Sequence, residues 1–113
     1  MQQPNEYQLY DEKMKQLQEI LVNRQKLLTQ KNENEMVKKE LEILEEDDVV
    51  YKLEDGDLQE EDPLEAEICV DQRLEYLEGE IKKCDEREAL LRKELADIQK
   101  KLQEIQKMAL NQK

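Results

Sequence analysis

Histidine, serine, phenylalanine and tryptophan are absent from this chain of 113 residues, and threonine occurs once, at Thr29. Without histidine or serine, the Ser/His and Cys/His nucleophile systems are excluded, and no imidazole is present for acid–base chemistry near neutral pH. The only two glycines, Gly56 and Gly79, cannot form a glycine-rich phosphate loop. We therefore expect that the protein is not an enzyme and uses no cofactor.

Cysteine is also scarce. Cys69 and Cys84 fall 15 residues apart in one predicted helix, a separation of about 22 Å at 1.5 Å per residue. A disulfide needs Cα atoms less than about 7 Å apart, so we expect two free thiols, with Cys84 as a small apolar residue. Two thiols without histidine do not make a zinc site, and free thiols fit a reducing compartment.

Long apolar runs are missing as well. The first six residues have neither the basic nor the apolar segment of a signal peptide, and no run approaches the length needed to span a membrane. We expect a soluble, cytoplasmic protein that binds neither membrane nor metal. Direct binding of nucleic acid is disfavoured, because no basic patch is present to neutralise phosphates.

What the chain does have is a long apolar period. Only 37% of the residues are hydrophobic and 42% are charged, yet from residue 70 to residue 109 apolar side chains recur at alternating steps of four and three. Glu88 alone interrupts the series. This period predicts a left-handed coiled coil and argues against disorder despite the net charge of -12. The stripe comprises Val70, Leu74, Leu77, Ile81, Cys84, Leu91, Leu95, Ile98, Leu102, Ile105 and Ala109.

The first half predicts a second helix, over about residues 5–46. Its apolar stripe continues to Leu28 and resumes at Val37, displaced by one position, so we expect a local discontinuity in the middle of this helix. The stripe comprises Tyr7, Tyr10, Met14, Leu17, Leu21, Arg24 and Leu28, then Val37, Leu41 and Leu44.

A β-hairpin is predicted between the helices, over residues 49–62. Asp55-Gly56 is a favoured pair for a two-residue type I′ turn and would place Leu53 opposite Leu58. The return strand, 58–62, is acidic and therefore a poor strand by composition. Asp62 and Pro63 then predict the N-cap and first turn of a helix over about 63–110. The outgoing strand comprises Val49, Val50, Tyr51, Lys52 and Leu53.

These elements predict a mostly α fold: a long antiparallel two-helix coiled-coil hairpin with a short β-hairpin between its arms, in a single domain over residues 1–113. Residues 45–67 hold twelve acidic side chains and one basic one. Solvation is the usual role of such a run. A calcium loop is the sharper alternative, but Tyr51 and Leu53 stand where an EF-hand needs oxygen ligands.

A lone two-stranded hairpin is marginally stable and has two open edges. We therefore expect the protein to oligomerise through its strands, using Val49, Val50, Tyr51, Lys52, Leu53 and Leu58.

Four segments resemble the prefoldin β-type subunits. They are Arg24-Gln25-Lys26-Leu27, the run from Glu33 to Leu41, Val49-Val50-Tyr51-Lys52-Leu53, and the run from Arg73 to Lys82. The resemblance implies a hetero-hexamer of α- and β-type subunits whose hairpins assemble into barrels. It also implies that the distal ends of the coiled coils hold unfolded actin and tubulin without ATP and pass them to the cytosolic group II chaperonin. The acidic segment from Glu54 to Asp62 departs from the family, whose relatives carry a Gly-Pro turn and an apolar strand there.

An antiparallel pair of helices would bring both ends of the chain to one tip. Met and Tyr side chains at fraying helix ends adapt to varied apolar surfaces, so we expect the client to bind there. The alternative is that the same residues only close the coiled coil. The predicted site comprises Tyr7, Leu9, Tyr10, Met14, Ile105, Met108 and Leu110.

Two other functions remain open. The chain could be a structural coiled-coil scaffold or dimerisation module that binds no client, for which a short helical loop would suffice between the arms. It could also be a coiled coil whose acidic hairpin binds a basic partner in place of a barrel.

Overall fold

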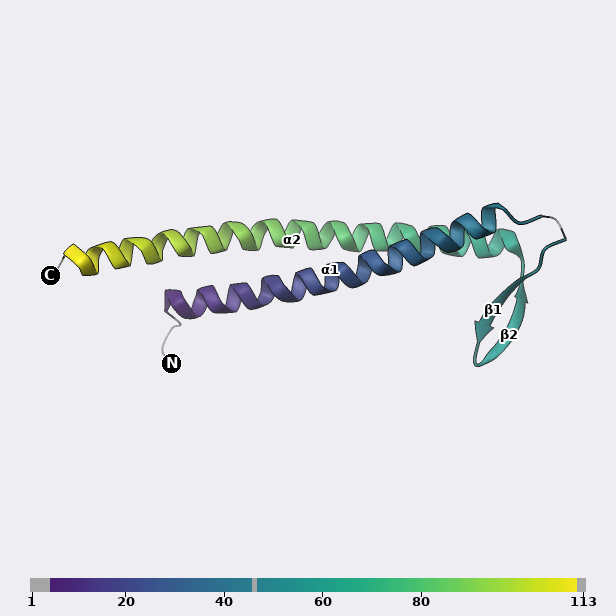
Figure 1. Cartoon of the computed structure of the whole chain (residues 1–113), viewed down its shortest axis with the longest axis horizontal. Coiled ribbons are helices and arrows are strands. Elements are labelled where there is room, and N and C mark those ends of the chain that lie inside the picture. The colour runs from purple at the N-terminus through teal and green to yellow at the C-terminus, as the bar shows by residue number, and fades with distance from the viewer. Residues whose placement is uncertain (1–4, 46, 112–113) are drawn as a thin grey trace. The chain divides into compact units, whose positions relative to one another are not determined.

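The computed structural model describes residues 5–45 and 47–111. Along the chain the elements are α1 (Glu6–Glu42), β1 (Val50–Glu54), β2 (Asp57–Glu61) and α2 (Pro63–Asn111) (Figure 1). The predicted fold class, two long helices with a short antiparallel β-hairpin between them, is confirmed. No helix within the described ranges is long and apolar enough to cross a membrane.

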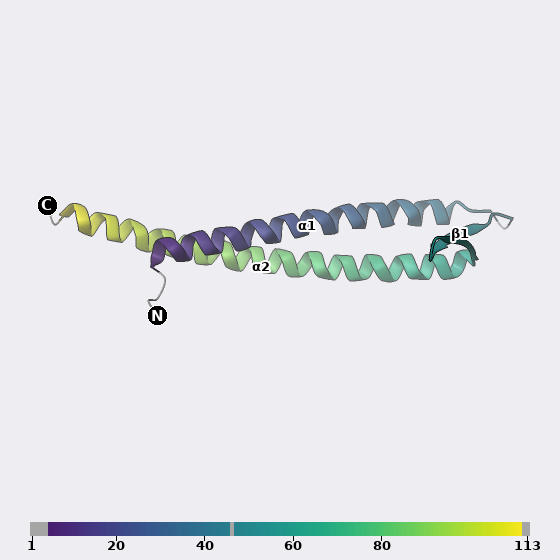
Figure 2. The same cartoon turned by 90° about the horizontal axis from the view of Figure 1, so that it is seen from below.

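The contacts divide the chain into two compact units. Unit 1 comprises residues 1–25 and 82–113, and unit 2 comprises residues 26–81. In unit 1 the first part of α1 lies along the second half of α2, whose last residues continue past the start of α1 (Figures 1 and 2). In unit 2 the rest of α1 lies along the first part of α2, next to the hairpin. The single domain expected over residues 1–113 stays a prediction.

Both helices begin with side-chain caps that the sequence encodes. Asn5 and Gln8 cap α1 reciprocally: the Gln8 N–H donates to Asn5 Oδ1 (2.9 Å) and the Asn5 N–H donates to Gln8 Oε1 (3.1 Å). Asp62 caps α2 as predicted, with its Oδ1 accepting from the Leu64 N–H at 3.1 Å. Pro63 is the first residue of α2, a position where its missing N–H costs no hydrogen bond.

The end of α1 differs from the prediction. The helix stops at Glu42, and the predicted end, residue 46, lies outside the described residues. A turn follows in which the Asp48 N–H donates to the Glu45 carbonyl (3.0 Å) and the Glu45 N–H donates to Asp48 Oδ2 (2.8 Å). Acidic side chains are unfavourable at the negative end of a helix dipole, so this acidic run is better accommodated in a turn.

The predicted apolar stripe of α2 is the main core of the protein. Every apolar member from Val70 to Ile98 is buried, together with Ala66, and Glu88 is half-buried. The last members of the stripe are not buried: Leu102 is half-buried, and Ile105 and Ala109 are exposed.

The predicted stripe of α1 is confirmed only in part, since most of its members are buried or half-buried but some are exposed. Only Leu17 and Ile20 are buried in this helix, whereas Leu21 and Val37, both predicted to be buried, are exposed. The predicted discontinuity is wrong, because half-buried residues continue the 3.5-residue period on both sides of it. They are Arg24 in unit 1 and Leu27, Lys31, Asn34, Lys38 and Leu41 in unit 2.

The hairpin has the predicted turn and register. Asp55 (φ 52°) and Gly56 (φ 83°) both have positive φ, as a type I′ turn requires. Leu53 pairs with Leu58 and Tyr51 with Glu60. The acidic return strand does pair, over Asp57–Glu61, and β1 begins at Val50 rather than Val49.

Candidate functional site

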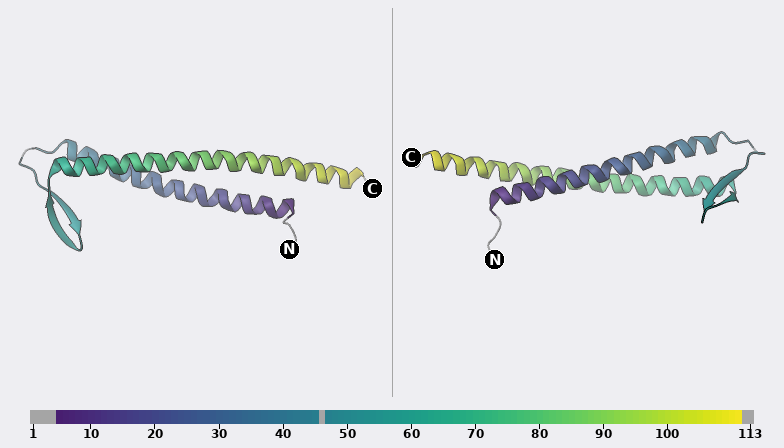
Figure 3. Two further views of the ribbon diagram at one scale, coloured as in Figure 1. Left: turned by 180° about the vertical axis from the view of Figure 1, so that it is seen from behind. Right: turned by 60° about the horizontal axis from the view of Figure 1, so that its bottom comes forward.

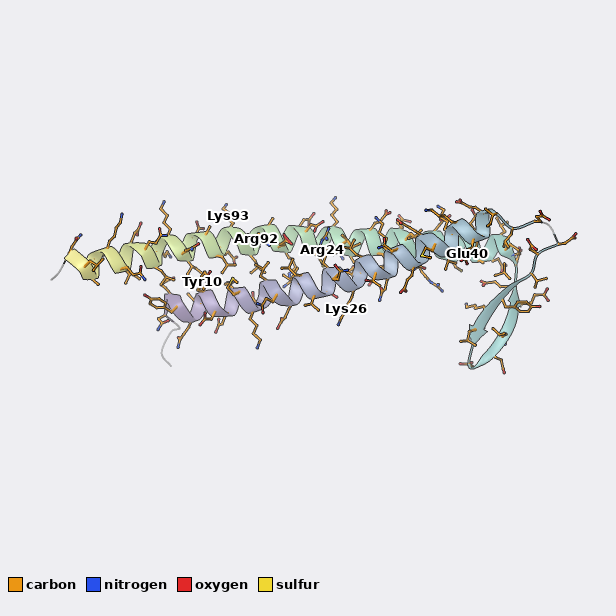
Figure 4. All side chains as sticks on the ribbon, viewed as in Figure 1. Tyr10, Arg24, Lys26, Glu40, Arg92 and Lys93 are labelled. Carbon is orange, nitrogen blue, oxygen red and sulfur yellow. The ribbon has the colours of Figure 1, made fainter. Side chains whose placement is uncertain are left out.

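Ion pairs between the helices show the register of unit 1. Lys13 Nζ lies 2.8 Å from Glu94 Oε2, and Arg24 Nε lies 2.6 Å from Asp85 Oδ1. The positions rise along α1 as they fall along α2, so the helices are antiparallel. Hydrogen bonding to Asp85, followed by its charge, raises the pKa of Arg24. Figure 4 labels Arg24 on the side of α1 that faces α2.

Unit 2 repeats the arrangement. Lys31 Nζ lies 3.8 Å from Glu78 Oε1, and Lys38 Nζ lies 2.8 Å from Asp71 Oδ1. Hydrogen bonding to Asp71, followed by its charge, raises the pKa of Lys38. The alkyl stems of such residues can cover an apolar stripe while their charged ends stay in water. This explains how α1 covers the core of α2 with so few apolar side chains of its own.

The register of unit 1 leaves the end of α2 without α1 beside it. Glu6, the first residue of α1, comes seven residues before Lys13. Seven residues beyond its partner Glu94 is Lys101, and ten more residues of α2 follow, to Asn111. At 1.5 Å per residue this overhang is about 15 Å long. Figures 1 and 2 show α2 continuing past the start of α1.

The predicted client-binding residues therefore form two groups at different levels of unit 1. Leu9, Tyr10 and Met14, in the paired part of α1, are half-buried, and Tyr7 is exposed. The other group belongs to the overhang, not beside the first as expected. There Met108 is 63% exposed and Leu110 is 69% exposed. Ile105, also exposed, continues the buried stripe of α2 onto this free segment.

The predicted oligomerisation strand is equally exposed. Leu53 and Leu58, which face each other across the hairpin, are each 70% exposed, and Val49 and Tyr51 are exposed too. Val50 alone of the apolar strand residues is half-buried. The hairpin projects from the ends of the helices of unit 2 (Figure 3).

Beneath the hairpin, unit 2 has a cavity of about 180 Å³. Val50 and Lys52 of β1 line it on one side, and Leu41, Cys69 and Val70 line it from the helices. The described residues bring together no group of three or more side chains suited to holding a metal ion.

The thiol of Cys84 lies in unit 1. Cys84 is buried in the stripe of α2, as predicted, and its Sγ accepts a hydrogen bond from Asn23 Nδ2 at 3.8 Å.

The sequence analysis placed Arg24 in the stripe of α1 but missed Lys31 and Lys38, which occupy stripe positions further along the helix. Arg24, Lys31 and Lys38 recur every seven residues, and so do their partners on α2, Asp71, Glu78 and Asp85. An analysis of apolar residues alone passes over the two lysines. A heptad period of lysine and arginine opposite a heptad period of acids is the signal that could have found them.

The two helices pair antiparallel within each unit, and an exposed hairpin joins them along the chain. This arrangement defines a prefoldin-like subunit. Comparison with known proteins agrees. A family model described as a prefoldin subunit matches residues 4–109. Prefoldin subunit 6 of Saccharomyces cerevisiae is 39% identical over 99 residues, which are 88% of this chain and 78% of that protein. Prefoldin subunit 6 of Homo sapiens is 35% identical over 108 residues, covering 89% of this chain and 84% of that protein.

A solved structure shows the same fold. The crystal structure of the prefoldin beta subunit from Thermococcus strain KS-1 matches with a TM-score of 0.83 at 22% identity, covering 88% of each chain. The chain belongs to the prefoldin subunit family, whose members are subunits of a chaperone.

Proposed function

We propose that the chain is a non-enzymatic subunit of a hetero-hexameric, ATP-independent holdase. In this proposal it binds unfolded polypeptides, such as actin and tubulin, at the end of unit 1. It then passes them to the group II chaperonin of the cytoplasm. Family membership supports the chaperone role, and the free thiols of Cys69 and Cys84 are compatible with a reducing compartment.

One observation carries the proposal: the apolar stripe of α2 continues beyond the helix that covers it. Ile105, Met108 and Leu110 are exposed on this overhang. A free apolar surface suits extended, partly apolar segments of unfolded chains, because apolar contact is non-directional and Met adapts its shape. Tyr7 and Leu9, at the start of α1, would extend the contact.

The hairpin supports the oligomeric part of the proposal. Its apolar residues Tyr51, Leu53 and Leu58 are too exposed to stabilise the isolated chain. Each strand is paired on one side only within the described residues. Other α- and β-type prefoldin subunits would supply the missing strands.

A scaffold without client binding is the second candidate. The heptad-spaced ion pairs favour it, because they fix the pairing of the helices without reference to any client.

Suppression of the aggregation of an unfolded client separates the two candidates. The triple variant Ile105→Ser, Met108→Ser, Leu110→Ser, incorporated into the full complex, should lose most of the suppression. The matched control is Val22→Ser, Leu90→Ser, which removes exposed apolar side chains from unit 1 outside the overhang. The control should protect the client as the unmodified complex does. If the triple variant protects equally well, the client binds elsewhere.

A further inference from the structure

The hairpin has two chemically different edges. β1 carries one basic and one acidic side chain, Lys52 and Glu54, among apolar neighbours. β2 carries Asp57, Glu60 and Glu61 with no basic residue. Both strands belong to one two-stranded sheet, so within the described chain the outer edge of each is unpaired.

An open antiparallel edge has the means to bind another strand. Along each strand, every second residue directs its N–H and C=O away from the partner already present. These groups can pair with an added strand, as in β-augmentation. Leu58 would contribute apolar contact on one face of the added pair, since it is 70% exposed.

Charge decides which strand can be added to β2. If Gln59 paired with its own copy in a second, antiparallel β2, Asp57 of each chain would stand opposite Glu61 of the other. Like charges directly opposite destabilise a strand pair, whereas opposite charges stabilise it. A second β2 is therefore a poor partner for this edge.

We propose that the outer edge of β2 pairs with a strand of a different polypeptide that carries lysine or arginine at positions opposite Asp57, Glu60 and Glu61. In an antiparallel partner, two neighbouring basic residues would face Glu61 and Glu60. An apolar residue two positions later would face Leu58, and a third basic residue directly after it would face Asp57. The inference rests on the proposed assembly through the hairpin and adds the chemistry of the neighbour. The neighbour at β2 is a basic strand, so the assembly is heteromeric by charge.

A short peptide containing Lys-Lys-Thr-Val-Lys is the probe, and its binding to the full chain is measured by calorimetry at several salt concentrations. Two control peptides replace lysine by glutamate or carry N-methyl groups on alternate backbone nitrogens. The second keeps the charge but blocks strand pairing. The lysine peptide should bind and both controls should not. Equal binding of the N-methylated peptide would overturn the inference, because it would show attraction by charge without pairing.

Charge reversal locates the site. The double variant Asp57→Lys, Glu60→Lys should lower the affinity for the lysine peptide by about tenfold or more, because opposite-charge pairs become like-charge pairs. Glu86→Lys, Asp97→Lys makes the same change in net charge at exposed positions of unit 1 before the overhang and should leave binding unchanged. If the two variants bind equally, the edge of β2 is not the site.

Native mass spectrometry with other prefoldin subunits distinguishes this inference from the proposed function. If the chain assembles but does not distinguish the lysine from the glutamate peptide, the inference fails and the proposed function stands. If the chain assembles with no other subunit, the proposed function fails, and the inference that rests on it fails with it.

Discussion

Two neighbouring leucines of α2 have opposite environments: Leu91 is 6% exposed and Leu90 is 58% exposed. Leu91→Ala should lower the free energy of unfolding by about 2 to 4 kcal/mol, because it removes buried methyl groups and leaves a cavity. Ile98→Ala should have a comparable effect. Leu90→Ala, the matched control, should stay within about 0.5 kcal/mol of the unmodified chain. Urea unfolding measures all three, and an equal loss at Leu90 and Leu91 would contradict the burial described.

Glu88 is the one charged residue in the apolar stripe of α2. Its Oε2 lies 3.3 Å from Arg92 Nε, one turn along the same helix. Such pairs contribute about 0.3 to 0.5 kcal/mol, whereas burying a leucine side chain contributes about 1.5 to 3 kcal/mol. Glu88→Leu should therefore raise the melting temperature, and the exposed neighbour Glu86→Leu should not. A lower melting temperature for Glu88→Leu would show that its carboxylate has a larger role.

At the scale of elements, the two glycines give a matched pair. Gly56 holds a φ of +83° in the hairpin turn, whereas a Cβ at helical Gly79 would meet nothing within 4 Å. Gly56→Ala should strain the turn and speed hydrogen exchange in β1 and β2. Gly79→Ala should stabilise α2 by about 0.4 to 1 kcal/mol, because it lowers the entropy of the unfolded chain. Unchanged exchange in Gly56→Ala would contradict the turn assignment.

The ion pairs between the helices make a second prediction at this scale. Lys38→Asp places a carboxylate beside Asp71 and should lower the melting temperature. Lys38→Asp, Asp71→Lys restores the pair with its charges exchanged and should recover part of the loss. Because Asp71 raises the pKa of Lys38, the contribution of the pair is complete below the ordinary lysine pKa of 10.5 and is lost as pH rises through the raised value. No recovery in the double variant would mean that the contact contributes nothing.

The sequence predicted the elements that depend on local chemistry. The turn at Asp55-Gly56, the cap at Asp62 and the stripe of α2 each follow from residue type and spacing over a few residues. The stripe of α1 could be predicted only in part, since Lys31 and Lys38 occupy stripe positions that an analysis of apolar residues passes over. The overhang of α2 could not be predicted, because its length depends on the register between two helices.

At the scale of the whole molecule, charge opposes self-assembly through the hairpin. Residues 45–67 carry a net charge of -11, so six copies would bring 66 excess negative charges into one assembly. Such charges repel appreciably within a Debye length of about 8 Å at physiological salt. The purified chain should therefore form no stable homo-hexamer, as measured by light scattering. A compact homo-hexamer at that ionic strength would contradict this expectation.

The central claim is that the overhang of α2 contacts the unfolded client, and site-specific photo-crosslinking in the assembled complex tests it most directly. A photoreactive side chain replaces Met108 on the overhang in one variant and Leu90, exposed on unit 1 before the overhang, in another. The account predicts strong crosslinks to an unfolded client from position 108 and few from position 90, with both disappearing when the client is native. Equal crosslinking from the two positions, or crosslinking from position 90 alone, would contradict it.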